Sequence, residues 1–237
     1  HGLELDAQFV DLVGATGVPE EVILTSAITT ASRGTVEQTA DDVKISNLTM
    51  EITSASSAGS NATEAAAYFP TTALANAVLS DVVCQSETTG VRSMRTNTEY
   101  AGTYTRVTSG STSFGYYGTA SGTFTDCVGD NNSFGAYGTA SGTFTDCVGG
   151  SLSFGSYGTA SGTFTDCVAG VHSFGGGGGT ASGTFTDCVA GDYSFGGDGG
   201  DASGTFTDCT SGDYSFGTGG TVDAGAVFIR CHGAGTH

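Results

Sequence analysis

The sequence predicts an all-β fold in which the chain winds into a parallel β-solenoid, a stack of similar coils. Three observations lead to this prediction. The hexapeptide GTFTDC occurs five times, starting at Gly122, Gly142, Gly162, Gly183 and Gly204. Phenylalanine recurs twice in each repeat, and Gly, Ser and Thr fill most of the remaining positions. A fixed period of about 20 to 50 residues is typical of stacked architectures.

The acidic residue of the hexapeptide marks the register of the coils. In the regular repeats the markers are Asp126, Asp146, Asp166, Asp187 and Asp208, and the irregular flanks fit the same frame with markers at Ser26, Asn47, Asp81, Arg106 and Arg230. Ten markers predict about ten coils of 20–22 residues each.

The spacing of the markers also predicts the organisation of the chain. We expect an entry strand or cap over residues 1–20, a single solenoid domain over 21–232 and a tail over 233–237. Within the solenoid, irregular coils should span 21–107, near-identical repeats 108–220 and a terminal coil 221–232. The long step from Asn47 to Asp81 predicts an inserted loop over 53–72, because solenoids place insertions on their surface.

Alternation within each strand predicts the interior of the coils. If Phe124 points inward, Thr123 and Thr125 point outward. Two interior ladders are therefore expected, and their members are Phe124, Phe144, Phe164, Phe185 and Phe206, and Cys127, Cys147, Cys167, Cys188 and Cys209. We expect buried free thiols, since one Cys per coil does not match the paired spacing of metal sites. Cys84 lies outside this ladder.

The segment Val43 to Thr49, VKISNLT, with Asn47 at the corner, is similar to an ordinary coil of one known class. It resembles the right-handed parallel β-helices of the pectate-lyase-like class, which occur in phage tail spikes, phage fibres and surface adhesins. The resemblance extends over roughly residues 20–232 and implies a right-handed solenoid. It does not imply one activity, because a single fold carries many functions.

Composition limits the partners. The chain has 237 residues, 24 acidic and 6 basic, with a formal net charge of −18. No Lys or Arg lies between Val107 and Ile229. Such a surface repels polyanions, so we expect no nucleic-acid partner. No apolar run approaches the length of about 20 residues that a membrane span needs, so membrane insertion is not expected.

The outward threonines form the most specific surface pattern. A T-x-T pair occurs on six consecutive coils, at Thr103, Thr105, Thr123, Thr125, Thr143, Thr145, Thr163, Thr165, Thr184, Thr186, Thr205 and Thr207. This grid is similar to the flat ice-binding face of insect antifreeze solenoids. Thr is also a favourable residue on any exposed strand. Ice, a glycan or a protein partner are the candidate ligands.

The aspartate column is interpreted as a row of corner residues, because Asp, Asn and Ser side chains bond local backbone in turns. No cofactor is expected, and Ca²⁺ along the column is the alternative, since hard cations take oxygen ligands. In the terminal coil, Val227 and Ile229 replace the outward threonines and predict assembly contacts.

We expect a structural or adhesive solenoid outside the cell or on a virion. It would be a phage fibre, an appendage component or a filament subunit that acts as a rigid spacer and binding surface. Its partners would be copies of itself, other virion or filament proteins, or a glycan receptor. Ice or glycan binding by the threonine grid is the alternative function. A polysaccharide-degrading enzyme ranks third, because the regular loops are nearly identical. A weak glycan-contact or partner site is expected at the insertion, near Glu64, Tyr68 and Phe69, with Arg92 and Arg95 downstream.

Overall fold

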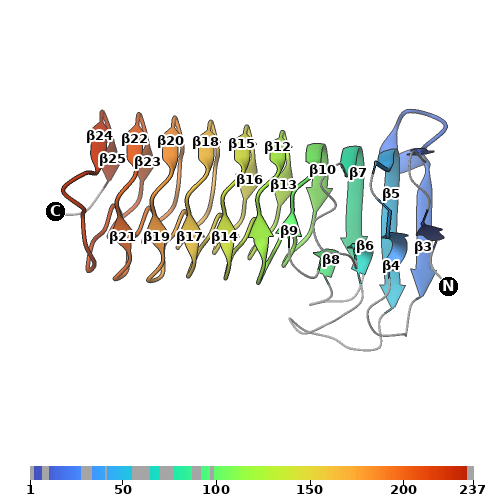
Figure 1. Ribbon diagram of the computed structural model, residues 1–237, viewed down its shortest axis with the longest axis horizontal. Coiled ribbons are helices and arrows are strands. Elements are labelled where there is room, and N and C mark those ends of the chain that lie inside the picture. The colour runs from blue at the N-terminus through green and yellow to red at the C-terminus, as the bar shows by residue number, and fades with distance from the viewer. Residues whose placement is uncertain are drawn as a thin grey trace.

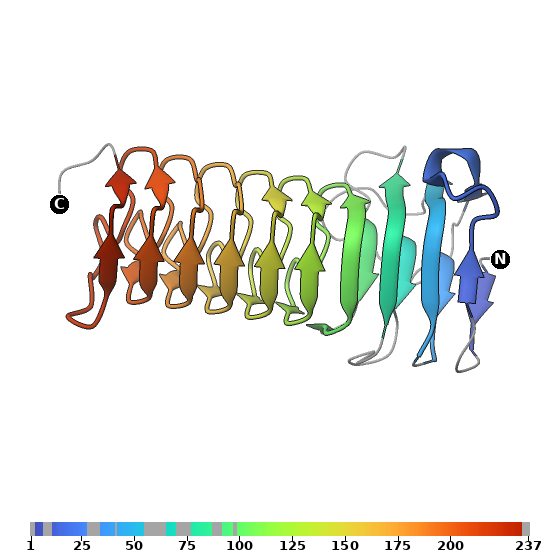
Figure 2. The same ribbon diagram turned by 90° about the horizontal axis from the view of Figure 1, so that it is seen from above.

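The computed structural model describes residues 3–6, 11–27, 34–40, 42–54, 65–69, 77–86, 92–96 and 99–233. Over these ranges the chain is an all-β parallel solenoid (Figures 1 and 2), with one short 3-10 helix at Pro19–Glu21. The stack has about eight turns, slightly fewer than the ten that the markers predicted.

Within the described ranges, four sheets form the walls. The longest has 13 strands. Its main path runs β2 (Asp11–Val13), β5 (Lys44–Ser54), β7 (Val78–Ser86), β10 (Thr103–Ser109), β12 (Thr123–Thr125), β15 (Thr143–Thr145), β18 (Thr163–Thr165), β20 (Thr184–Thr186), β22 (Thr205–Thr207) and β24 (Val227–Ile229). The same sheet includes β3 (Ile23–Ala27), β13 (Val128–Gly129) and β16 (Val148–Gly149). This sheet runs the whole length of the solenoid (Figure 1).

The other sheets close the coils. In the N-terminal part, a four-stranded sheet joins β1 (Leu3–Leu5), β4 (Gly34–Gln38), β6 (Ala65–Phe69) and β8 (Arg92–Thr96). In the regular repeats, a six-stranded sheet joins β9 (Glu99–Tyr100), β11 (Thr119–Ala120), β14 (Thr139–Ala140), β17 (Thr159–Ala160), β19 (Thr180–Ala181) and β21 (Asp201–Ala202). A small sheet pairs β23 (Thr210–Ser211) with β25 (His232–Gly233).

The structure corrects the register of the first coil. Ser26 of β3 pairs with Ile52, five residues beyond the corner at Asn47 where the sequence frame placed it. Instead, β2 pairs with the strand before that corner, and the amide of Gly14 donates to the carbonyl of Ser46 at 2.8 Å. The first coils are therefore longer than the regular ones. From sequence, β3 fitted the predicted coil register as well as β2 does. Apolar alternation determines which face of a strand is buried, but it does not determine which strand is its partner.

Parts of the predicted N-terminal cap and of the predicted inserted loop are strands of the solenoid wall. Residues 3–5 and 11–13, expected in an entry strand or cap, pair in parallel with β4 and β5. Residues 65–69, expected within an inserted loop, form β6 between β4 and β8. Residues 53 and 54 of that predicted loop are the end of β5, and its remaining residues, 55–64 and 70–72, lie outside the described residues.

Phenylalanines fill the interior of the regular repeats. Each of two columns stacks its rings almost face to face, with centroids 4.7–5.0 Å apart from one coil to the next. The two columns meet edge to face at 5.4–5.8 Å. Offset-stacked and edge-to-face pairs are the preferred aromatic geometries. The core is therefore a continuous aromatic rod rather than a globular cluster.

Close backbone contact between coils explains the glycine of the repeat. A Cβ added at Gly162 would lie 2.2 Å from the carbonyl oxygen of Gly142, and Gly122, Gly142, Gly183 and Gly204 show the same approach. The obstacle is backbone, so it cannot move aside as a side chain would. Each SGTFTDC segment thus packs its glycine against the glycine of the preceding coil.

Candidate binding face

The twelve threonines lie in two columns on the long sheet. Thr123 and Thr125 flank the buried ring of Phe124, and each pairs in register with its counterpart on the next strand. The same register holds from β10 to β22. The first column is mostly exposed and the second half-buried. The columns continue into Val78 and Ser80 at one end and into Val227 and Ile229 at the other.

The aspartates form a third column at the corner after the threonines. Asp126, Asp146, Asp166, Asp187 and Asp208 have φ values of 53–54°. This left-handed conformation is tolerated best by Gly, Asn and Asp, which explains the residue type at the corner. Each of these Asp amides donates to a carbonyl of the next coil, as Asp126 does to Thr145 at 3.0 Å. The acceptor is a threonine for the first four and Ile229 for Asp208.

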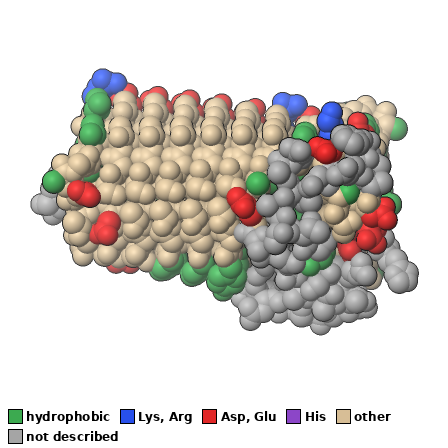
Figure 3. Space-filling view, in the orientation of Figure 1, with side chains coloured by type: hydrophobic (Ala, Val, Ile, Leu, Met, Phe, Trp, Pro, Cys, Tyr) green, Lys and Arg blue, Asp and Glu red, His purple; other side chains and the backbone are tan. Residues whose placement is uncertain are grey.

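Arginines stand at both ends of this aspartate column. Arg106 makes a two-point ion pair with Asp81, and Arg230 pairs in the same way with Asp208. Hydrogen bonding to these guanidinium groups lowers the pKa of Asp81 and Asp208. Figure 3 shows the resulting row of acidic side chains along one edge, with basic side chains at its two ends.

Calcium along the column stays a prediction. Among the residues that the structure describes, no group of three or more His, Cys, Asp or Glu is placed to hold a metal ion. The column presents one carboxylate per coil, about 4.8 Å from the next. Oxygen-rich Ca²⁺ sites need six to eight ligands, so further ligands would have to come from water or from a partner.

A fourth, apolar column was missed by the sequence reasoning. Val128, Val148, Val168 and Val189 are 40–46% exposed, and bridges between neighbouring coils connect them in register. The signal was present: after the corner, Cys127 faces inward, so the next residue must face outward. Across the face, the coils of β12, β15, β18 and β20 therefore present Thr, Thr, Asp and Val in the same order, and in the coil of β22 Thr210 takes the place of Val.

The cysteine ladder lies inside the wall, beneath this face. Cys127, Cys147, Cys167, Cys188 and Cys209 are buried, and all seven cysteines are free thiols. Their Sγ atoms donate to carbonyls, as from Cys127 to Tyr104 at 3.3 Å. Burial also raises the pKa of Cys84. These thiols serve as small interior side chains that contact their neighbours.

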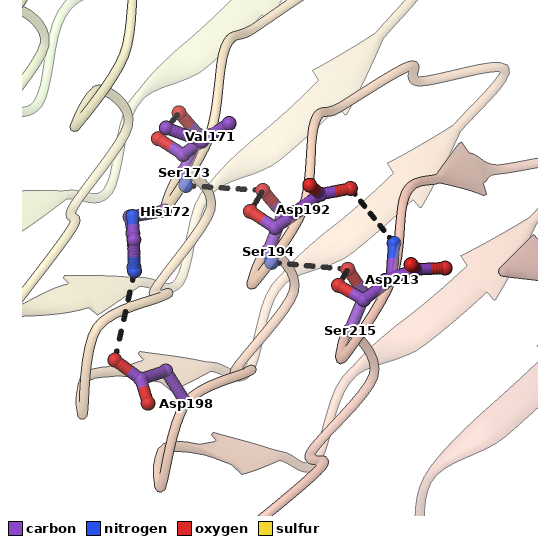
Figure 4. A network of polar contacts seen from close by, with 8 residues as sticks. All are labelled: Val171, His172, Ser173, Asp192, Ser194, Asp198, Asp213 and Ser215. Carbon is purple, nitrogen blue, oxygen red and sulfur yellow. Dashed lines mark hydrogen bonds and ion pairs between the residues drawn. The ribbon is translucent and has the colours of Figure 1, made fainter. Parts of the chain in front are cut away.

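Two aromatic rows lie on other corners. Tyr117, Tyr137 and Tyr157 are exposed, and the ring centroid of Tyr137 lies 5.6 Å from that of Tyr117 and 5.0 Å from that of Tyr157. The His172 ring stacks on Tyr193, with centroids 4.8 Å apart. Its Nε2 lies 3.5 Å from Asp198 Oδ2 (Figure 4).

The polar contacts around His172 run from coil to coil. The Asp213 amide donates to Asp192 Oδ1 at 2.8 Å, and the Ser194 amide donates to Ser215 Oγ at 3.1 Å (Figure 4). These polar contacts do not converge on a common point. They connect neighbouring coils and do not form a binding site.

The structure does not support the glycan contact expected at Tyr68 and Phe69. Both side chains are buried, because β6 packs into the wall. At the terminal coil, by contrast, Val227 and Ile229 are 43% and 42% exposed.

No family model, curated protein or solved structure matches this chain. Over the described residues, no helix is long and apolar enough to cross a membrane.

Proposed function

We propose that the chain is a rigid spacer with a repetitive binding face, part of an extracellular or virion-borne appendage such as a phage fibre or a surface filament. The observation that carries this proposal is the repetition itself. Five regular coils, from β12 to β22, stack the same phenylalanine rings and the same outward threonines in register. A rigid spacer can be built from identical coils, whereas a catalytic site needs a local irregularity in the repeat.

The aromatic core supports the mechanical role. Every interior ring in the two columns touches rings above, below and beside it, so bending the rod would separate several contacts at once. About eight turns at about 4.8 Å per turn give a rod about 40 Å long. A right-handed winding of the pectate-lyase-like type belongs to the proposal, since that class includes spikes, fibres and adhesins.

Immunogold labelling tests the location. Antibodies raised against the purified chain should label fibrous structures on the cells or virions that produce it, with pre-immune serum as the control. Label confined to the cell interior would contradict the proposal.

The threonine columns favour a second candidate, binding of ice or of a flat glycan surface. Twelve hydroxyl- and methyl-bearing side chains repeat at the strand spacing on one sheet, without an interruption between β10 and β22. Thermal hysteresis with ice-crystal shaping tests the first ligand, and glycan-array binding tests the second. A Thr163→Lys variant should abolish either signal, because one long charged side chain interrupts the plane. An unchanged signal in this variant would exclude the threonine face as the binding surface.

A further inference from the structure

The two ends of the long sheet both expose apolar side chains. At the N-terminal end, Val13 of β2 and Ile23 of β3 are 56% and 51% exposed. At the C-terminal end, Phe228 of β24 is 37% exposed, although every other ring of its column is buried. Among the described residues, no strand pairs with the outer edges of β2, β3 or β24. Open strand edges with apolar side chains favour pairing with another strand.

The register of the long sheet shows which side chains would contact each other if a strand like β2 paired with the outer edge of β24. Following the pairs from strand to strand, Leu12 lies in the column that ends at Phe228. Val13 lies in the column that ends at Ile229. A coil added beyond β24 with the sequence of β2 would thus place Leu12 on Phe228 and Val13 on Ile229, two apolar contacts, and Asp11 on Val227.

A third column agrees with this match. Ile23 lies in the column that ends at His232 of β25. At the corner, Arg230 would meet the level of Gly14, which has no side chain to obstruct it. The strands are parallel throughout, so the direction of β2 is the one that the edge of β24 requires.

The two ends differ in charge. The first coil exposes five acidic residues, Glu4, Asp6, Asp11, Glu20 and Glu21. The last coil carries one exposed acidic residue, Asp223, and Arg230, whose side chain is 69% exposed despite its pair with Asp208. Repulsion therefore disfavours contact between two N-terminal ends more than contact between an N-terminal and a C-terminal end.

We infer that the β24 edge of one copy binds the β2 edge of a second copy, in a head-to-tail contact. Such a contact is heterologous, so successive copies extend the stack along its axis rather than closing a ring. The purpose of this contact rests on the proposed function, since spacers that join end to end form a longer rod. The partner is therefore a second copy of this chain.

Two variants that each block one end test the inference. Val13→Lys places a positive charge on the N-terminal edge, and Ile229→Lys places a like charge on the C-terminal edge, so that the two blocked ends also repel each other. Sedimentation velocity over a range of concentrations should show growing oligomers for the wild type and monomers for each variant alone. An equimolar mixture of the variants should form dimers and nothing larger, because one unblocked end remains on each partner.

Thr165→Lys is the matched control, since it adds charge in the middle of the same sheet and should assemble like the wild type. Circular dichroism of all three variants checks that the β-fold is retained. A wild-type chain that stays monomeric overturns the inference, as does a mixture that forms no dimer or a control that loses assembly. A monomeric chain that still labels appendages would leave the proposed function standing. If the chain forms oligomers but is found only inside cells, the head-to-tail contact stands and the proposed function is contradicted.

Discussion

Arg106 holds the carboxylate of Asp81, one coil before it, with two guanidinium nitrogens: Nε lies 2.6 Å from Oδ1 and Nη2 lies 2.9 Å from Oδ2. Both residues have positive φ, 51° and 54°, at the same corner of successive coils. The pair therefore replaces the repulsion of two neighbouring carboxylates by an attraction, at the point where the regular aspartate column begins.

This pair should stabilise the fold in a pH-dependent way. Hydrogen bonding to Arg106 lowers the pKa of Asp81 in the folded state, so its stabilisation is complete above the ordinary Asp pKa of about 4 and is lost as the pH falls through the lowered value. The Arg106 side chain is 56% exposed and the Asp81 side chain 30%, so solvent screening should keep the coupling small. A double-mutant cycle with Asp81→Asn and Arg106→Gln, measured by urea unfolding at pH 7 and pH 2, checks both points. Equal coupling at the two pH values would contradict this account.

Removing one ring should interrupt the aromatic core. Phe164 is fully buried between Phe144 and Phe185, with centroids at 4.9 and 4.8 Å. Phe164→Ala should lower the free energy of unfolding by about 3–5 kcal/mol, because it leaves a cavity in the column. Chemical denaturation gives the value, and Thr165→Ala on the neighbouring outward position should cost far less. Similar losses in the two variants would mean that the column contributes little.

A methyl group should not fit between the coils at the repeat glycine. Gly162→Ala should destabilise by about 1–3 kcal/mol, the range for overpacking, because its Cβ meets the Gly142 carbonyl at 2.2 Å. Gly225 is the matched control: a Cβ there comes no closer than 3.9 Å to Asp223. Thermal unfolding of Gly162→Ala and Gly225→Ala should separate the two. A Gly162→Ala protein as stable as the control would refute the close approach.

The cysteines should differ sharply in reactivity. Thiolates react with alkylating reagents, and burial suppresses both access and ionisation. Cys231, which is half-exposed, should be alkylated by iodoacetamide in the native protein, whereas Cys84 and Cys167 should be modified only after unfolding. Peptide mass spectrometry of native and denatured samples gives the order. Early labelling of Cys167 would show that the wall opens under native conditions.

The solenoid, its period and the inward side of the regular coils could all be predicted from the sequence. Strands expose alternate side chains on opposite faces, and a repeat that stacks on itself leaves each residue beside its own counterpart. For Thr163 or Phe164, the neighbour on the next coil is therefore the same residue type, and no other information is needed. The valine column followed from the same rule, although the sequence reasoning did not draw it.

The irregular coils needed the tertiary structure. Ser26 lies in β3 and Gly14 directly follows β2, and both strands are short and alternating. Only the pairing of β2 and β3 with β5 shows that Gly14, not Ser26, lies beside the corner at Asn47. Likewise, Tyr68 and Phe69 became wall residues because β6 pairs with strands more than 20 residues away in each direction. Local pattern determines which face of a strand is apolar. The choice of partner strand depends on the summed packing of distant segments, and that sum exists only in the folded chain.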